Sequence, residues 1–260
     1  MITNQRPALS VISVSHKNLA GLAKTERSLQ LLSGINFEWI VVDTGFCRET
    51  TEWLGALSAD YSLRYKCEPD EGIYDGMNKG ITMAVGRWLW FLNAGDMVSP
   101  KINRQCVDGL LESADAAQIN FDFEIERDGI TYTRRSKGPS WIWYAMPTSH
   151  QAMWFCRDAV RDGYDLSYPW AADHELTARV YAAGKGVQTV HNQIAIVEFE
   201  GTSRDNFDIY RYELALINRR SLKAGPAKAF AILLLQLLAG WCATRLARIY
   251  LVLNPSRFFK

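Results

Sequence analysis

The chain has 260 residues, of which 48% are hydrophobic and 22% are charged, and this composition excludes disordered and fibrous proteins. Its 29 basic and 28 acidic residues give a formal net charge of +1 at pH 7, so nothing in the overall charge points to nucleic acid as a partner. The length favours one α/β domain with an appendage.

The first hundred residues alternate short apolar runs with amphipathic stretches, which is the pattern of βα units in a parallel sheet. The predicted strands are Leu9–Val14, Glu38–Asp43, Leu63–Cys67 and Trp88–Asn93. The predicted helices between them are Leu19–Leu32, Thr50–Leu57 and Tyr74–Ala84. Parallel sheets of this kind bind ligands beyond the carboxyl ends of their strands, so we expect the chemistry near Asp43 and the segment Asn93–Asp96.

Beyond Lys101 the pattern is less regular. A helix is predicted to end at Ser113, and a hairpin is predicted at Asp128-Gly129. The predicted strands are Ala116–Phe121, Phe123–Arg127, Ile130–Arg134, Ala152–Cys156, Val187–His191 and Ile194–Phe199. The predicted helices are Asp173–Ala183 and Phe207–Ser221. We therefore predict one domain, large enough to be a catalytic domain, at 1–221 and a C-terminal segment at 222–260.

The C-terminal segment is both basic and apolar. After Glu213 there is no Asp or Glu, whereas eight Lys and Arg residues follow, so a mildly acidic body carries a basic tail. The run Ala229–Ala243 has 15 residues with only Gln236 strongly polar, and this is shorter than the roughly 20 residues that span a bilayer. The pattern favours a helix lying on an anionic lipid surface. The alternative is a helix docked on its own domain or on a second subunit.

The most distinctive segment runs from Glu68 to Ile81 and reads EPDEGIYDGMNKGI. Gly72 permits close approach of the backbone to a ligand. Asp75 and Lys79 are four residues apart and have a simple structural explanation as a surface ion pair. Asp70 and Asn78 have no such explanation. The segment is followed by Phe91-Leu92-Asn93-Ala94-Gly95-Asp96, an acidic strand end.

This arrangement resembles the inverting family 2 glycosyltransferases of the GT-A fold, and within them the enzymes of colanic acid and related exopolysaccharide assembly. The resemblance covers roughly residues 9–205 and includes Ser149-His150-Gln151-Ala152, Ala172-Asp173 and Glu200-Gly201-Thr202-Ser203. It implies a Rossmann-like α/β fold, with a mostly parallel central sheet and helices on both faces. It also implies a transferase that uses a nucleotide-sugar donor.

The resemblance assigns the donor to two strand ends and to the distinctive segment. In the family, the first strand end and the Asp that closes the second strand hold the base and ribose. The donor-binding residues implied here are Ser13, Ser15, Asp43, Asp70, Gly72, Asn78 and Asn93. The alternative for Asp43 is turn chemistry, since Asp-Thr-Gly suits a strand-to-loop transition without any ligand.

The family's D-x-D motif binds a divalent cation that bridges the two phosphates, and its counterpart here is Asn93-Ala94-Gly95-Asp96. Only one carboxylate is kept. Mg²⁺ or Mn²⁺ can use one or two carboxylates together with phosphate oxygens and water, so the resemblance implies Asp96 as the metal ligand. The alternative for Asp96 is a turn or a helix cap.

An inverting transfer needs a base that takes the proton of the acceptor hydroxyl, and the family places an Asp at the start of a later helix for this role. The matching residue is Asp173, whose alternative is a helix N-cap. His150 and Gln151 lie on the acceptor or phosphate side. For His150 we leave open metal binding, phosphate or sugar binding, and a buried hydrogen bond.

The resemblance, together with the basic and apolar C-terminal segment, implies a hexosyltransferase that uses a nucleotide-sugar to extend a lipid-linked saccharide in exopolysaccharide assembly. The alternatives are a catalytically impaired donor-binding protein and a membrane-attached scaffold. Met1–Ser10 has no apolar h-region, and the five cysteines form no C-x-x-C pair. We therefore expect a cytoplasmic protein, peripheral on the inner face of the cytoplasmic membrane.

Overall fold

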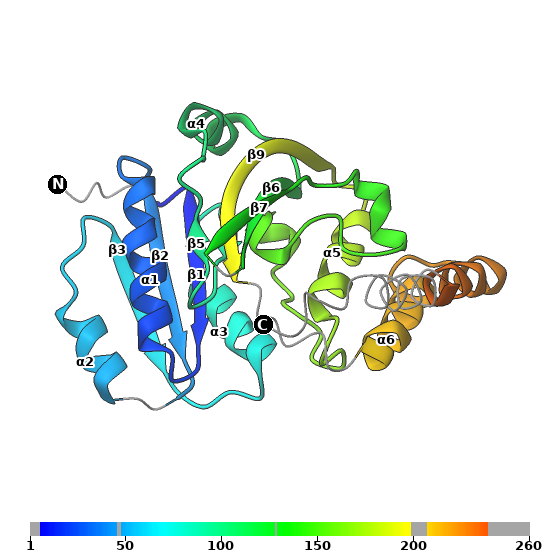
Figure 1. The fold of residues 1–260 in the computed structure, drawn as a ribbon, viewed down its shortest axis with the longest axis horizontal. Coiled ribbons are helices and arrows are strands. Elements are labelled where there is room, and N and C mark those ends of the chain that lie inside the picture. Colours follow the sequence, from blue (N-terminus) through cyan, green and yellow to red (C-terminus); the bar gives the residue numbers. More distant parts are fainter. Residues whose placement is uncertain (1–5, 46–47, 128, 199–206, 239–260) are drawn as a thin grey trace, which may run out of the picture.

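The computed structural model describes residues 6–45, 48–127, 129–198 and 207–238 (Figure 1). Within these residues the strands form one sheet in the order β3-β2-β1-β4-β8-β6-β9-β5, and β7 pairs with β6 outside this path. The loop Glu200–Ser203, which forms part of the family resemblance, lies outside the described residues.

The first half of the sheet is parallel, as predicted. It contains β1 (Leu9–Ser15), β2 (Phe37–Asp43), β3 (Ser62–Cys67) and β4 (Trp88–Phe91). The connecting helices are α1 (Leu19–Leu29), α2 (Arg48–Ala56) and α3 (Ile73–Met83), and the short η1 (Gln30–Leu32) follows α1. β1 and β2 are buried along their whole length, as expected for central strands covered on both faces. Asn18 caps α1 by accepting a hydrogen bond from the Gly21 amide at 2.9 Å.

The second half of the sheet is mixed, so the prediction of a mostly parallel sheet is wrong. Of the eight strand pairings that the structure describes, β1–β2, β1–β4, β2–β3 and β6–β9 are parallel and the other four are antiparallel. The physical reason is the connection: β8 (Met153–Cys156) is entered through the short η3 (His150–Ala152), not through a crossover helix.

Two predicted strand pairs are single strands in the structure. The first pair lies in β6 (Gln118–Arg127), which has a register irregularity around Asp122, and the second lies in β9 (Val187–Glu198). The short β5 (Met97–Val98) was not predicted. β7 (Ile130–Arg134) forms the expected hairpin with β6. The remaining elements are α4 (Arg104–Ser113), η2 (Pro139–Trp143), η4 (Arg157–Ala159) and α5 (Ala172–Ala182).

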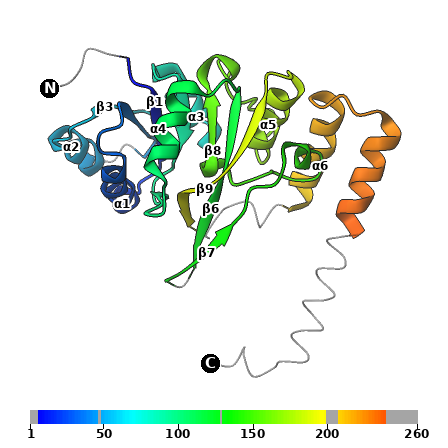
Figure 2. The ribbon, with the colours of Figure 1, turned by 90° about the horizontal axis from the view of Figure 1, so that it is seen from above.

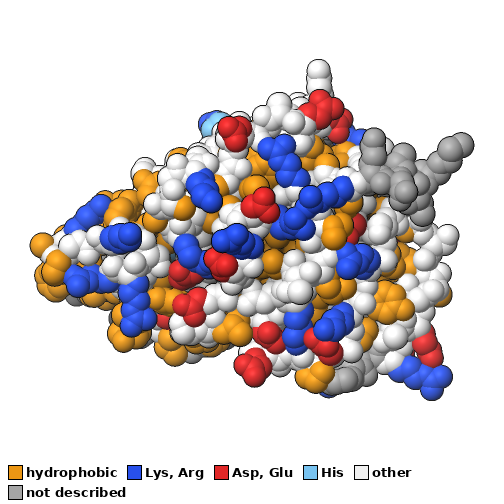
Figure 3. All heavy atoms as spheres, turned by 180° about the vertical axis from the view of Figure 1, so that it is seen from behind, with side chains coloured by type: hydrophobic (Ala, Val, Ile, Leu, Met, Phe, Trp, Pro, Cys, Tyr) orange, Lys and Arg blue, Asp and Glu red, His pale blue; other side chains and the backbone are white. Residues whose placement is uncertain are grey.

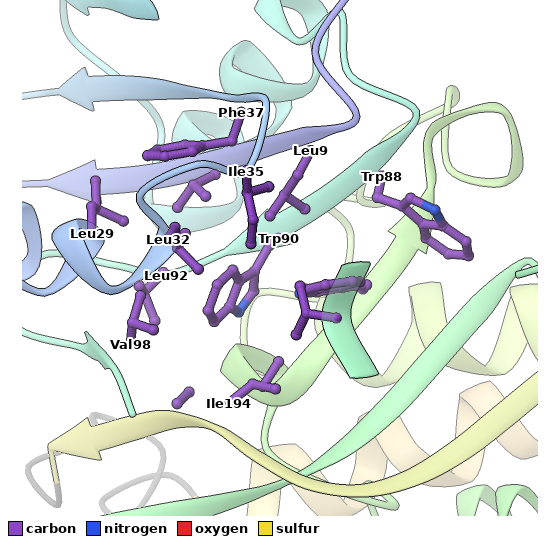
Figure 4. Packing of buried hydrophobic residues seen from close by; sticks show 14 of the residues in the cluster. Leu9, Leu29, Leu32, Ile35, Phe37, Trp88, Trp90, Leu92, Val98 and Ile194 are labelled. Carbon is purple, nitrogen blue, oxygen red and sulfur yellow. The ribbon is translucent and has the colours of Figure 1, made fainter. Parts of the chain in front are cut away.

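Helices cover both faces of the sheet, as predicted. One face packs against α1, α2 and α4 through Leu22, Leu54 and Val107, and Figure 4 shows part of this cluster around Trp90 and Leu32. The other face packs against α3 and α5 through Met77 and Leu176. Side chains alternate along a strand, so neighbouring residues of β1 such as Val11 and Ile12 pack into the clusters on opposite faces of the sheet. This double layer holds the strand ends in fixed positions.

Two further helices lie at one end of the molecule. Figure 2 shows α6 (Phe207–Arg220) beside α5, with a helix at 226–238 beyond it. Gln236 Nε2 donates a hydrogen bond to the Tyr144 carbonyl at 2.7 Å, and Lys228 Nζ lies 3.2 Å from the centre of the Trp143 ring. Only part of the predicted helix Ala229–Ala243 falls among the described residues. In that part of the chain, no helix is long and apolar enough to cross a membrane.

Candidate active site

A cleft of about 520 Å³ lies where the chain leaves β4. It brings together side chains from distant parts of the sequence, and five of the predicted site residues line it: Asn93, Asp96, His150, Gln151 and Asp173. The other six predicted residues, Ser13, Ser15, Asp43, Asp70, Gly72 and Asn78, are not among the described residues that line it.

The segment Asn93–Asp96 is held in place by β1 and α1. The Val14 amide donates to Asn93 Oδ1 at 3.4 Å. The Thr25 hydroxyl of α1 donates to the Asp96 carbonyl at 2.7 Å and accepts from the Gly95 amide at 3.1 Å. Gly95 has a φ of +106°, a conformation that strongly favours glycine. The backbone before Asp96 is therefore fixed by contacts that do not involve its carboxylate.

The carboxylate of Asp96 is only 6% exposed. Its Oδ1 accepts a hydrogen bond from the Glu198 amide at 3.3 Å, and the Gln151 side chain also bonds to it. Burial raises the pKa of Asp96 to about 7, and the nearby charge of Glu198 acts in the same direction. Burial therefore disfavours the ionised form of this carboxylate.

Asp173 lies in the first turn of α5, but it is not the N-cap. The N-cap is Ala171, whose side chain makes no capping bond. Asp173 Oδ1 instead accepts hydrogen bonds from the His174 amide at 2.8 Å and from the Tyr74 hydroxyl at 3.2 Å. Burial raises the pKa of Asp173, and these two bonds act against that increase. A carboxylate thus faces the cleft from the end of a helix.

His150 and Gln151 also line the cleft. His150 Nε2 lies 2.7 Å from the Tyr164 hydroxyl, and the imidazole packs against the Phe91 ring. Burial lowers the pKa of His150 to about 4, so the ring is neutral at neutral pH. These contacts favour the interpretation of His150 as a buried hydrogen-bonding histidine. Gln151 Oε1 accepts from the Ser149 hydroxyl at 2.5 Å, so Gln151 links η3 to Asp96.

The strand ends of β1 and β2 hold two unsatisfied polar groups. Ser15 and Asp43 are paired in register, and both are buried. Neither the Ser15 hydroxyl nor either carboxylate oxygen of Asp43 has a hydrogen-bond partner among the described residues. Leaving buried polar groups unpaired is costly, so these atoms are suited to a ligand. Ser13 differs, because its hydroxyl donates to the Leu92 carbonyl and accepts from Trp39 Nε1 within the core.

The distinctive segment Glu68–Ile81 forms a loop followed by α3. Gly72 is the N-cap of α3 with a φ of +121°, so its conformation itself explains the glycine. Asp70 Oδ1 accepts from the Gly72 amide at 3.1 Å. The Asp75–Lys79 ion pair is present at 3.1 Å. Asn78 Nδ2 donates to the Tyr164 carbonyl at 3.0 Å and its Oδ1 accepts from the Tyr164 amide at 2.7 Å. In the structure Asn78 therefore holds the loop at Tyr164 through two hydrogen bonds to its backbone.

The sequence model of glycosyl transferase family 2 matches residues 10–163 of this chain. The chain belongs to glycosyltransferase family 2. An uncharacterized glycosyltransferase of Mycobacterium tuberculosis is 31% identical over 207 residues, which are 75% of this chain and 76% of the relative. Family membership and this similarity confirm the prediction of a nucleotide-sugar glycosyltransferase.

Solved structures of glycosyltransferases share the fold. The structure of S. aureus TarS 1–349 in complex with UDP-GlcNAc has a TM-score of 0.65 and 15% identity, over 88% of this chain and 71% of TarS 1–349. The mannosyltransferase PcManGT from Pyrobaculum calidifontis, in complex with GDP-Man and Mn²⁺, has a TM-score of 0.63 and 13% identity, over 96% of this chain and 81% of PcManGT.

The residues around Asp96 of this glycosyltransferase fit a divalent cation. The deciding observation is that a buried carboxylate, Asp96, lines the cleft together with the amide side chain of Asn93, and oxygen donors are the ligands that Mg²⁺ prefers. Among the described residues, no group of three or more His, Cys, Asp or Glu side chains could hold a metal ion. A cation at Asp96 would therefore complete its coordination with donor phosphates and water, which is usual for Mg²⁺.

Sequence reasoning missed several residues of this glycosyltransferase site. Tyr74, Trp170, Glu198 and Tyr210 all line the cleft. Tyr74 lies inside the distinctive segment, so its position was a signal, although its bond to Asp173 joins residues 99 positions apart. Glu198 lies inside the predicted strand Ile194–Phe199 and ends β9 in the structure, but nothing in its local sequence connects it with Asp96. These contacts depend on the tertiary fold.

Proposed function

We propose that this family 2 glycosyltransferase moves a hexose from a nucleotide-sugar to a hydroxyl group of a lipid-linked saccharide, with inversion, in exopolysaccharide assembly. The observation that carries the proposal is the position of Asp173. Its carboxylate faces the same cleft as Asp96, whereas its backbone is held in α5. The proposed base and the residues proposed to bind the diphosphate thus line the same cleft.

The donor is proposed to extend from the strand ends into the cleft. Its nucleoside would satisfy the unpaired oxygens of Asp43 and Ser15, which lie at the carboxyl edge of the sheet. Its diphosphate would lie beside Asn93 and Asp96. TarS and PcManGT are described with UDP-GlcNAc and GDP-Man, which supports a nucleotide-sugar donor but leaves the base and sugar open.

In the proposed reaction the acceptor oxygen attacks the anomeric carbon from the face opposite the diphosphate. A bond forms between these two atoms, the bond between the anomeric carbon and the diphosphate oxygen breaks, and Asp173 takes the hydroxyl proton. The Tyr74 hydroxyl orients the carboxylate of Asp173. Burial raises the pKa of Tyr74, so its hydroxyl stays protonated and donates this bond.

A divalent cation, Mg²⁺ or Mn²⁺, is the proposed cofactor, and Asp96 would hold it. When bound, such an ion neutralises charge on a departing diphosphate. Gln151 and the Glu198 amide orient the Asp96 carboxylate from behind. Thr25 fixes the backbone on which the carboxylate stands.

The acceptor side and the membrane are proposed to meet at the end of the molecule formed by α6 and the helix 226–238. Trp170 and Tyr210 line the cleft, and Tyr210 belongs to α6. The helix 226–238 exposes Phe230, Leu234 and Leu237. Figure 3 shows hydrophobic side chains together with Lys and Arg side chains at this end of the molecule. This combination favours peripheral binding to an anionic membrane, at its cytoplasmic face, with a lipid-linked acceptor.

The proposed role of Asp173 is tested by Asp173→Asn. We expect transfer of radiolabelled sugar to a membrane-lipid extract to fall by about a hundredfold or more, because the general base is lost. Donor affinity, measured by calorimetry, should stay nearly unchanged. Asp162→Asn is the matched control, since the side chain of Asp162 is 79% exposed. Full transfer by Asp173→Asn would exclude Asp173 as the base, and donor binding without transfer by the wild-type protein would favour a binding protein.

A further inference from the structure

The space beside Gly95 is occupied by a carboxylate from another part of the chain. A Cβ atom on Gly95 would lie 3.0 Å from Glu198 Oε2 and 3.5 Å from Glu198 Oε1. Gly95 stands directly before Asp96, in the segment that keeps only one of the two carboxylates of the D-x-D pattern. A carboxylate is thus present where the local sequence supplies none.

The sheet positions Glu198. β5 pairs with β9 through Met97 and Ile196, so the end of β9 lies beside the residues that follow Asp96. The Glu198 amide donates to Asp96 Oδ1 at 3.3 Å. Glu198 and Asp96 also line the same cleft. Its position therefore follows from strand pairing and a backbone hydrogen bond, not only from the reach of its side chain.

The side chains around Glu198 carry more negative than positive charge. Lys24 Nζ lies 2.6 Å from Glu198 Oε1 and 3.2 Å from Glu126 Oε2. One lysine is therefore shared by two glutamates, and one of these, Glu198, also contacts the Asp96 carboxylate through its backbone amide. When all three carboxylates are ionised, these four side chains carry a formal charge of −2, which a divalent cation would offset. The Glu198 side chain is 49% exposed, so water or a ligand can reach it.

We infer that Glu198 is a second carboxylate ligand of the cation held at Asp96, and that it replaces in space the acidic residue that the segment Asn93–Asp96 lacks. This inference rests on the proposed metal-dependent function. In this inference Lys24 forms an ion pair with Glu198 when no cation is bound, and Lys24 and the cation compete for the Glu198 carboxylate. Carboxylate oxygens are the ligands that Mg²⁺ and Mn²⁺ prefer.

The test is the affinity for Mn²⁺, measured on the full chain from the electron paramagnetic resonance signal of the free ion, with saturating UDP or GDP. Glu198→Gln should weaken Mn²⁺ binding by about tenfold or more, because a ligand is lost. Glu126→Gln is the matched control, because it removes the other glutamate bound to Lys24. Its affinity should change by less than about threefold, as an ion pair this accessible contributes little.

Lys24→Met separates a metal ligand from a structural partner of Lys24. If Glu198 binds the cation, removing the competing lysine should leave Mn²⁺ binding equal or tighter. If Glu198 acts only by holding Lys24, then Lys24→Met should weaken Mn²⁺ binding as Glu198→Gln does, and this result would overturn the inference. Unchanged affinity in Glu198→Gln would overturn it too. A wild-type protein that binds no Mn²⁺ with either nucleotide would instead refute the proposed metal dependence, and the inference with it.

Discussion

At the residue scale, the hydrogen bond between Tyr74 and Asp173 joins the distinctive segment to the proposed base. The phenol belongs to α3 and the carboxylate to α5, and their oxygens are 3.2 Å apart. Burial raises the pKa of Asp173, and the bond from Tyr74 limits that increase. Tyr74 is therefore a positioning residue that orients the carboxylate and favours its ionised form.

Tyr74→Phe removes the hydroxyl and keeps the ring. The pKa of Asp173 should rise further, and because only the ionised carboxylate accepts a proton, the acid limb of the kcat profile should move to higher pH. At neutral pH, kcat should fall about tenfold, since a hydrogen bond to a charged group is lost. The donor KM should stay constant. Tyr65→Phe, on an exposed ring of β3, is the control. An unshifted acid limb would contradict this role of Tyr74.

At the element scale, Asn78 connects α3 to the loop that contains Tyr164. Both hydrogen bonds of its side chain go to the backbone of Tyr164, whose hydroxyl lies 2.7 Å from His150. A Cβ on Gly163 would lie only 2.4 Å from Asn78 Oδ1, so the loop approaches the helix as closely as glycine permits. The sequence predicted donor binding for Asn78, but the structure gives its polar atoms a structural use.

Asn78→Ala tests which use is correct. Loss of two partners for the Tyr164 backbone should lower the free energy of unfolding by about 1–3 kcal/mol, measured by urea denaturation. Thr82→Ala on the same helix, whose hydroxyl is exposed, is the control. Donor affinity, measured on the folded variant, should change little. A large loss of donor affinity with unchanged stability would instead support the donor-binding prediction.

The parallel half of the fold was predictable because β1, β2 and β4 are short segments rich in apolar residues, and helical periodicity separates the strands. The mixed half was not predictable to the same extent. β6 contains the polar Asp122 and β9 contains His191, and both residues interrupt an apolar pattern without ending the strand. Asp122 Oδ1 accepts from the Ser136 amide at 2.8 Å and lies 3.0 Å from His191 Nδ1, so tertiary contacts satisfy these polar groups.

The candidate site was predictable where its residues lie in local motifs. Asp96 and Asp173 follow from the resemblance, and both line the cleft. The positions of Tyr74 and Glu198 depend on how α3, α5 and β9 meet, which local sequence does not encode. Ser13 was predicted to bind the donor, but its hydroxyl is buried and forms hydrogen bonds with Leu92 and Trp39. A strand-end position alone does not distinguish a ligand contact from a core contact.

At the scale of the whole molecule, the groups with a proposed function are arranged one after another across the sheet. The unpaired oxygens of Ser15 and Asp43 lie at the ends of β1 and β2, Asp96 follows β4, and Asp173 stands on α5. The apolar helix 226–238 lies beyond α6 (Figure 2). This order suits a donor on one side, an acceptor on the other, and a membrane next to the acceptor.

The most direct test of this account is thermal stability against UDP-, GDP- and dTDP-sugars, with and without Mn²⁺, in the wild-type protein and in Asp96→Ala. A ligand at 100 times its Kd should stabilise the protein by roughly 2.7 kcal/mol. We predict that one donor class stabilises the wild-type protein in a Mn²⁺-dependent manner and that Asp96→Ala loses this effect. The absence of stabilisation by every donor, in a protein that is folded, would contradict a nucleotide-sugar site in this cleft.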